Sequence, residues 1–317
     1  MEDIRAVFNR KTVKVPLVAV TGGKGGTGKT TVAVNLAATL TGMGHHVLLV
    51  DTDVDSPTTS IVLGVRPETL LAVEAFVPKI VETKCIKCGR CAEVCRPHAL
   101  VQIKNGYPMF FGELCSGCEA CRISCPAEAI AAGKKTLGTV NRTSKDRMTF
   151  IGGELRIGEA RSAEVVVAAK QAAFNEISKD GYDIMIVDTA PGTHCNVVQG
   201  LRASDLAIAV TEPTLLGIYD LELILQLSRE IGIPTKVVMN KSTIAGGDKE
   251  GVVKMVAEYG SEVFAEIPVD KQLFKAYVMG QPLVEAYSDS PAALALTNLA
   301  ELVSKHMRLR VSCDKST

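Results

Sequence analysis

The stretch VTGGKGGTGKTT, residues 20–31, decides the fold, because it joins an apolar run to an amphipathic segment through a glycine-rich turn. Residues 23–30 fit the pattern G-x-x-x-x-G-K-[ST] in the strand–turn–helix context that the pattern requires. Glycines there let backbone N–H groups close around phosphate oxygens, and the helix N-terminus adds a favourable partial charge. The pattern predicts a phosphate-binding loop rather than a ligand-free turn, formed by Gly23, Lys24, Gly25, Gly26, Thr27, Gly28, Lys29, Thr30 and Thr31.

Two side chains of this loop have predicted roles in nucleotide chemistry. Lys29 is expected to reach the terminal phosphates, and the Thr30 hydroxyl is expected to bind Mg²⁺. The expected cofactors of this part of the chain are therefore ATP or ADP and Mg²⁺.

The rest of the flanking sequence repeats an alternation of buried strands and helices. Nearly continuous apolar runs such as HVLLVDTD and YDIMIVDTA end in polar residues, which is typical of parallel strands covered on both faces. Between such runs, segments such as SAEVVVAAKQAAFNEISKDG have helical periodicity. The alternation predicts an α/β fold with a doubly wound, mostly parallel sheet.

Composition narrows the function classes. The 317 residues contain 35 basic and 35 acidic side chains, so no net field attracts nucleic acid. No stretch approaches the roughly 20 apolar residues that span a bilayer, and the first 20 residues lack a signal-peptide pattern. We expect a cytoplasmic protein that binds neither nucleic acid nor membrane.

Cysteines are concentrated in the middle of the chain, where eight of the ten lie between residues 85 and 125. A reducing cytosol disfavours disulfides, so the clustering indicates metal. CIKCGRCAEVCRPHAL is echoed thirty residues later by CSGCEACRISCPAEAI, an internal duplication with the spacing C-x₂-C-x₂-C-x₃-C in both copies.

This spacing is typical of two-cluster bacterial ferredoxins, in which the fourth cysteine of each run binds the other cluster. We therefore assign two 4Fe–4S clusters. Two Cys₄ zinc sites are the alternative, although zinc sites usually use two separated CxxC pairs. Pro97 departs from the pattern by one position without removing a ligand. The first ligand set is Cys85, Cys88, Cys91 and Cys125, and the second is Cys115, Cys118, Cys121 and Cys95.

The Cys-rich segment interrupts the α/β rhythm, which resumes after it. We predict an inserted ferredoxin-like domain at 80–135 within an ATPase domain formed by 1–79 and 136–317. The stretch 134–158 is expected to form β-hairpin structure that joins the insert to the main sheet.

The second lysine of the loop, Lys24 in KGGTGKT, resembles the deviant Walker A signature of the ATPase class that includes Min-type and Par-type positioning ATPases and the nitrogenase iron protein. The resemblance implies that Lys24 reaches across a nucleotide-sandwiched dimer to the partner's phosphates, where it would act as a charge clamp. A solvated loop lysine is the alternative.

The resemblance extends to two carboxylates that follow strands. Asp53 in LLVDTDVDSP matches the switch I carboxylate that orients or deprotonates the attacking water, with Asp51 and Asp55 as weaker candidates. Asp188 in IMIVDTAPGTH matches the Walker B carboxylate near Mg²⁺. A helix N-cap is the alternative for any one of them.

The same resemblance implies a pocket for the base of the nucleotide. Asn240 in VVMNKS resembles the base-contacting asparagine, and Pro268 lies in EIPVD, which is expected to form the second wall.

Taken with the insert, these motifs resemble the MinD-superfamily P-loop ATPases that contain an inserted ferredoxin domain. These ATPases are related to iron–sulfur scaffold ATPases.

Cys195 resembles one of two cysteines with which the nitrogenase iron protein holds a cluster across its dimer, but Glu159 stands where the other is expected. A bridging cluster of that type is therefore not expected. A site made by two copies of Cys195 and a small buried residue are the two alternatives.

The function that this resemblance implies is a dimeric Mg-ATP-hydrolysing switch that gates electron transfer from low-potential 4Fe–4S clusters to a partner protein. An ATP-dependent assembly or carrier protein for iron–sulfur or heterometal clusters is the alternative. A Par/Min-type positioning ATPase ranks below both, and a synthetase on the same fold ranks last. Expected partners are a second copy or a related ATPase, and a redox or metallocluster client.

Overall fold

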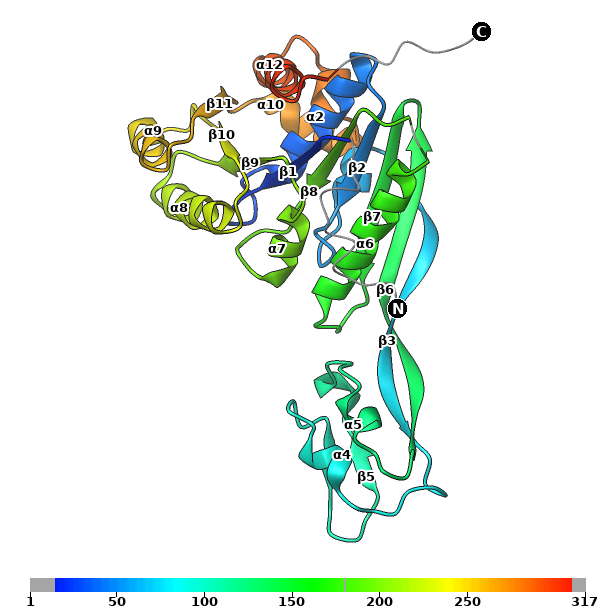
Figure 1. Cartoon of the computed structure of the whole chain (residues 1–317). Helices are drawn as coiled ribbons and strands as arrows, with labels where there is room; N and C mark the ends of the chain where they lie inside the picture. Colours follow the sequence, from blue (N-terminus) through cyan, green and yellow to red (C-terminus); the bar gives the residue numbers. More distant parts are fainter. Residues whose placement is uncertain (1–14, 180, 310–317) are drawn as a thin grey trace.

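A computed structural model describes residues 15–179 and 181–309, which form one nine-stranded sheet with helices on both faces (Figure 1). The strand order is β11-β10-β9-β1-β8-β2-β7-β6-β3. The first seven strands in this order are parallel, and the last two are antiparallel to their neighbours. The parallel strands are β1 (Leu17–Thr21), β2 (Val47–Asp51), β7 (Met148–Leu155), β8 (Ile184–Asp188), β9 (Leu206–Thr211), β10 (Thr235–Met239) and β11 (Val263–Glu266).

Alternation of side chains along the central strands supplies two cores. In β1, Val18 and Val20 pack on one face, whereas Leu17 and Ala19 pack on the other. All four are at most 1% exposed, because parallel strands covered on both faces bury both sets of side chains. The continuous apolar runs in the sequence predicted this arrangement, and the α/β class with a mostly parallel sheet is confirmed.

Helices cover both faces of the sheet. The first core includes residues of α2 (Lys29–Gly42) and α12 (Pro291–His306), and the second includes residues of α6 (Ser162–Ile177) and α7 (Cys195–Leu201). A third core packs α8 (Leu215–Glu230) and α9 (Lys249–Glu258) against β9 and β10. The remaining helices of the core are α3 (Thr59–Val62), α10 (Lys271–Met279) and α11 (Leu283–Ala286).

The antiparallel edge of the sheet leads to the Cys-rich insert. Strand β3 (Glu68–Ile80) pairs with β6 (Ile130–Lys145) from Glu68 opposite Arg142 to Ile80 opposite Ile130. Strand β6 then turns into β7 as an antiparallel hairpin, which confirms the β-hairpin expected over 134–158. The sequence analysis did not predict β3 as a strand. Figure 1 shows the two long strands as a twisted ribbon with residues 81–129 at its end.

The insert has the internal symmetry that the sequence repeat predicts. Helices α4 (Arg90–Glu93) and α5 (Ala120–Ile123) are offset by thirty residues, and each carries a buried cysteine, Cys91 or Cys121. Positive φ angles recur at three pairs of positions with the same offset: Lys87 and Gly117, Gly89 and Glu119, and His98 and Glu128. The other elements are β4 (Leu100–Gln102), β5 (Pro108–Phe110) and the 3₁₀ turn η2 (Gly112–Leu114).

Two expectations concern residues outside the described ranges. The first is the expected absence of a signal peptide, which rests mostly on residues 1–14. The second is that the polar segment RLRVSCDKST predicts an exposed thiol at Cys313. Within the described part of the chain, no helix is long and apolar enough to cross a membrane.

Candidate functional site

The functional side chains gather where five neighbouring parallel strands end. In the order β10-β9-β1-β8-β2, these ends carry Asn240, Glu212, the phosphate loop, Asp188 and Asp51. Parallel strands place their carboxyl ends at one edge of the sheet, and ligands of doubly wound folds bind outside that edge. The topology therefore brings together residues that are far apart in the chain, as in the Asn240–Thr27 contact across 213 positions.

Backbone geometry of the loop explains two of its glycines. Gly26 and Gly28 have φ angles of 79° and 98°, in the region where a Cβ is strained. A Cβ on Gly28 would also collide with the amide nitrogen of Asn240. The Asn240 Nδ2 donates to Thr27 O at 2.7 Å, so the loop and the residue after β10 are joined directly.

Lys29, the first residue of α2, lies inside the loop. Its Nζ donates to Lys24 O at 2.9 Å, and the residue is only 6% exposed. Burial lowers the pKa of Lys29, while the nearby carboxylates of Asp188 and Asp53 oppose that shift. The positive charge is thus held at the position where a phosphate group would approach the loop.

Lys24 has a partner within its own chain. Its Nζ lies 2.6 Å from Glu212 Oε1, and the same carboxylate pairs with Lys241 at 3.0 Å. Lys241 also donates to Gly26 O at 2.9 Å. No sequence motif pointed to Glu212 or Lys241, although both follow strand ends at this edge. The structure therefore places Lys24 in an intrachain ion pair, and its predicted reach into a partner subunit stays a prediction.

Two buried carboxylates lie side by side beneath the loop. Asp51 accepts from the backbone N–H groups of Asp53 and Thr59 at 2.9 and 3.2 Å, and Asp188 Oδ2 accepts from the Thr59 hydroxyl at 3.1 Å. Burial raises the pKa of Asp188 to about 6. Burial first, and then the charge of Asp188, raise the pKa of Asp51 as well. Thr59 is a further residue that the sequence analysis missed.

Asp188 fits the expected Mg²⁺ site. Its Oδ1 is buried without a well-formed hydrogen bond among the described residues, although the Thr30 hydroxyl is close enough to lower the pKa of the carboxyl. A buried carboxylate oxygen that lacks a donor is a suitable ligand for a hard cation. The geometry therefore brings together the two residues, Thr30 and Asp188, that the sequence assigns to magnesium.

Asp53 lies nearer the solvent than Asp51 and Asp188. Burial raises its pKa, whereas the positive charge of Lys29 opposes that rise, so the two charges lie within electrostatic range of each other. Asp55, a weaker candidate, is exposed.

The expected base pocket brings its two segments together. Ser242 N donates to Ile267 O at 2.9 Å, and Ile267 N donates to Met239 O at 2.9 Å. Pro268, the next residue, is thereby held beside the Asn240 loop. The role of both residues toward a base stays a prediction.

The eight clustered cysteines surround two separate cavities in the insert. Cys85, Cys88, Cys91 and Cys125 line one, and Cys95, Cys115, Cys118 and Cys121 line the other. In both cavities three cysteines come from one run and the fourth comes from the other run. This is the partition that the sequence spacing predicts.

The lining of each cavity supplies four cysteines, which is the ligand set that a four-iron cluster takes. Within the described residues, no three His, Cys, Asp or Glu side chains come close enough to hold a single metal ion. Tetrahedral zinc needs its sulfurs within roughly 4 Å of each other, given Zn–S bonds of about 2.3 Å, whereas a cluster spreads its ligands farther apart. Apolar residues complete both linings, including Ile80 and Ile130 in the first and Phe76 and Leu100 in the second. Burial raises the pKa of the Cys91 thiol, and that of Cys121 to about 11, so bound iron would have to offset this cost.

Cys195 lines an open groove between the N-terminal ends of α6 and α7, and Glu159 directly precedes the first residue of its lining. Residues 160–164, 193–196 and Val198 line this groove, which has a volume of about 730 Å³. Cys195 is exposed, so the small-buried-residue interpretation of this cysteine is wrong. Glu159 is 6% exposed and pairs with Lys135 at 2.8 Å and Arg161 at 3.2 Å. Burial alone would raise its pKa, but these two cations hold the pKa of Glu159 at about 2.

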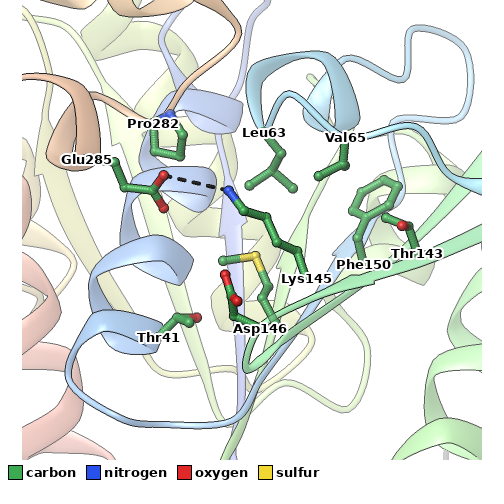
Figure 2. Close-up of a pocket in the computed structure, with 10 residues that line it drawn as sticks. Thr41, Leu63, Val65, Thr143, Lys145, Asp146, Phe150, Pro282 and Glu285 are labelled. Atoms are coloured by element: carbon green, nitrogen blue, oxygen red, sulfur yellow. Dashed lines mark ion pairs between the residues drawn. The ribbon is translucent and has the colours of Figure 1, made fainter.

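A different cavity, of about 40 Å³, lies away from both sites. Figure 2 shows Lys145 and Glu285 facing each other across it at 4.0 Å, with Thr41 near the end of α2. Thr41 is twelve residues after Lys29, about 18 Å along the helix axis from the phosphate loop. We therefore place this cavity outside the nucleotide site.

Comparison with known proteins agrees with this geometry. An uncharacterised protein of Methanocaldococcus jannaschii is 34% identical over 275 residues, which cover 86% of this chain and 93% of that protein. An iron–sulfur cluster carrier protein of Pyrococcus abyssi is 29% identical and covers 91% of this chain and 85% of its own length.

Solved structures show the same fold. The septum site-determining protein MinD of Pyrococcus horikoshii, complexed with Mg-ADP, superposes with a TM-score of 0.60 at 21% identity, covering 92% of this chain and 97% of that chain. Residues 18–283 match the pattern of one family, described as the CobQ/CobB/MinD/ParA nucleotide binding domain. The match covers most of the described chain and includes the phosphate loop, Asp188 and Asn240, and the chain therefore belongs to this family of P-loop ATPases.

Proposed function

We propose that this protein is a Mg-ATP-dependent carrier of iron–sulfur clusters, which hydrolyses ATP to control the transfer of a cluster to a client protein. The observation that carries the proposal is the sorting of eight cysteines into two cavities of four, in a chain whose core is a MinD-type ATPase. Relatives named iron–sulfur cluster carrier proteins support it, at 26–29% identity in three Pyrococcus species.

The nucleotide part of the mechanism follows from the residues at the sheet edge. The loop N–H groups and Lys29 would bind the phosphates. Thr30 and Asp188 would hold Mg²⁺, which would neutralise charge on the phosphates. Asp53 lies within electrostatic range of Lys29 and orients the water that attacks the terminal phosphate. Asn240 fixes the loop through Thr27 and holds the base pocket in register.

The cysteine part of the mechanism depends on access. Cys88 and Cys118 are exposed, whereas Cys91 and Cys121 are buried. An exposed cysteine is the ligand that a client would replace first: the client's thiolate would form a bond to iron, the bond between iron and the exposed cysteine would break, and the released thiolate would take up a proton from solvent. Each cavity therefore has one open and one closed side, as release of a cluster requires.

The experiment that tests the proposal is anaerobic reconstitution of the full chain with iron and sulfide. Two filled cavities should give about eight irons per chain, and Cys88→Ala should remove about half of them. The loaded protein should then convert an apo-ferredoxin of the Cys₄ type to its holo form faster with Mg-ATP than without. Iron content near zero in the wild-type protein would contradict the proposal.

Gated electron transfer is the second candidate, and one observation favours it. Each cavity has a complete set of four cysteines with an apolar lining, which is suited to retaining a cluster. Potentials of such clusters depend on solvent exposure and on hydrogen bonds to sulfur. Clusters that stay bound through many ATP turnovers, with electrons but no iron reaching the acceptor, would favour this candidate over the carrier.

A further inference from the structure

Arg161 of the ATPase core lies against the second cysteine loop of the insert. An ideal Cβ on Gly117, which stands between Cys115 and Cys118, would lie 3.1 Å from Arg161 Nη1. The arginine is the N-cap residue of α6 and therefore belongs to the main sheet's helical layer, not to the insert. A side chain of the core thus contacts the loop that supplies two predicted ligands of one cavity.

The guanidinium of Arg161 retains unused hydrogen-bonding capacity. Its Nε donates to Glu159 at 3.2 Å, but Nη1 and Nη2 are buried and have no hydrogen-bond partner among the described residues. Glu159 also pairs with Lys135, so this one carboxylate faces two cations. The side chain of Arg161 is 13% exposed. A positive charge that is only partly balanced is therefore held in a poorly solvated position beside the loop, where its field is weakly screened.

The internal repeat of the insert allows the two cysteine loops to be compared position by position. Lys87 occupies in the first loop the position that Gly117 occupies in the second, and both have positive φ, 58° and 72°. Lys87 is exposed, with its Nζ 4.3 Å from the centre of the Tyr107 ring. The first loop therefore carries its own solvated cation. The second loop has a glycine at the point where the core's arginine approaches.

The segment that carries Arg161 also contacts the nucleotide side of the core. Leu155 N, at the end of β7, donates to Val54 O at 2.8 Å, next to Asp53. Arg161 lines the α6–α7 groove opposite His194 and Cys195, which follow Asp188 in the chain. The arginine is thus linked through residues 155–161 to the segment that carries Asp53, and it lines the same groove as the segment that follows Asp188.

We propose that Arg161 is a positioning residue that the ATPase core contributes to the second iron–sulfur site. Its charge stabilises the reduced cluster held by Cys95, Cys115, Cys118 and Cys121, and so raises the reduction potential of that cluster and not of the other. Reduction adds one negative charge to a cluster, and nearby positive charge favours that state. This inference rests on the proposed cluster binding.

The test uses full-length protein reconstituted anaerobically and titrated by EPR at defined potentials. Cys88→Ala isolates the second site and Cys118→Ala isolates the first. On the Cys88→Ala background, Arg161→Gln should shift the one-electron reduction equilibrium about tenfold toward the oxidised form, a change of about 59 mV. On the Cys118→Ala background the same substitution should leave the potential unchanged. Arg161→Lys should keep the second site's potential close to the wild-type value, because lysine retains the positive charge.

Two further variants complete the design. Lys87→Gln is the matched control and should not change the second site's potential. Gly117→Ala should displace the flexible guanidinium and shift the second site in the same direction as Arg161→Gln, which keeps the test decisive if the glutamine variant folds poorly. An unchanged second-site potential at wild-type iron content, or equal shifts at both sites, would overturn the role of Arg161. Absence of bound iron in the wild-type protein would instead overturn the proposed function, and this inference with it.

Discussion

At the scale of single residues, the lysines of the predicted nucleotide site each lie near carboxylates of the same chain. Lys24 and Lys241 share Glu212, and Lys29 faces Asp53 and Asp188. Such pairs at a half-buried edge orient side chains more than they stabilise the fold, since exposed ion pairs contribute about 0–1 kcal/mol. Their value lies in placing two lysines at the phosphate loop before a ligand arrives.

Substitutions of the two loop lysines should affect nucleotide binding and ATP hydrolysis differently. Lys29→Ala removes the buried cation at the start of α2, so nucleotide affinity should fall by at least about tenfold, the loss of one charge-assisted hydrogen bond. Lys24→Ala should keep binding within a few-fold and lose most of the hydrolysis, if this lysine acts on the transferring phosphate. Fluorescent-nucleotide titration and phosphate release measure the two effects. Unchanged hydrolysis in iron-replete Lys29→Ala protein would refute the site.

Asp188 should lower the stability of the nucleotide-free protein at neutral pH. Burial raises the folded-state pKa of Asp188 from 3.8 to about 6, so the folded protein binds this proton more tightly than the unfolded chain does. The stability that the bound proton contributes is complete below the unfolded pKa and is lost as pH rises through about 6. Asp188→Asn should therefore raise the free energy of unfolding at pH 8 by up to about 3 kcal/mol, and by little near pH 4. Urea denaturation at both pH values checks this.

The same variant should lose its response to magnesium. Without the carboxylate, Mg²⁺ should no longer strengthen ATP binding, although the neutral side chain can still accept from Thr59. A variant that is no more stable than wild type at pH 8, or that keeps full Mg²⁺ dependence, would contradict the assignment.

At the scale of elements, helix α7 is tied to α6 by one buried lysine. Lys170 Nζ donates to Gln199 O, Gly200 O and Arg202 O at 3.0, 2.9 and 2.5 Å, at the C-terminal end of α7. Burial, and then the positive charge of Arg202, lower the pKa of Lys170 to about 7. The ammonium form is the one that donates to all three carbonyl oxygens. The helix that starts at Cys195, just after the Asp188 segment, is thereby fixed at its far end.

Removal of this lysine should destabilise the protein strongly. Lys170→Met leaves several buried carbonyl groups without a donor, and we expect a loss of roughly 3 kcal/mol in the free energy of unfolding. Lys179→Met, which removes an exposed partner of Glu176 just beyond the end of α6, is the control and should cost less than about 1 kcal/mol. Equal losses in denaturant titrations of the two variants would show that the carbonyl contacts contribute nothing.

The β3–β6 ribbon predicts that the insert can be removed without loss of the core. Ile80 and Ile130 are directly paired, and Val81 N donates to Ala129 O at 2.8 Å. Replacement of residues 81–129 by Asn-Gly should close the two strands with a two-residue hairpin turn. Thermal unfolding and nucleotide titration should show a folded, ATP-binding protein without iron. A variant that aggregates or loses nucleotide binding would indicate that the insert is part of the ATPase fold.

The sequence predicted most strands and the cysteine partition, because both signals are local. A buried strand such as Ile184–Asp188 is a run of apolar residues, and a cysteine run has fixed spacing. Strand β3 was missed because most of its residues are exposed or half-buried and its partner is about sixty residues away. Glu212, Thr59 and Arg161 were missed for a related reason: their roles come from contacts with residues distant in the chain, to which no local pattern points.

At the scale of the whole molecule, the β3–β6 ribbon joins the ATPase core to the Cys-rich insert (Figure 1). Arg161 of the core also lies against the second cysteine loop. The phosphate loop lies at the carboxyl end of the central strand β1. The cysteine cavities lie in the insert, which follows the outer antiparallel strands β6 and β3. Coupling between such sites requires that nucleotide bind two states of the molecule with different affinity. The segment from Val54 through Leu155 to Arg161 is where we expect those states to differ.

The measurement that tests the central claim is the rate of cluster transfer from anaerobically loaded protein to an apo-ferredoxin, with Mg-ATP, with Mg-ADP and without nucleotide. We expect faster transfer with Mg-ATP, no acceleration in Lys29→Ala, and loss of iron from the donor equal to the gain by the acceptor. Transfer at one rate under all three conditions, with ATP hydrolysis intact, would contradict the proposal that the ATPase controls the cysteine sites.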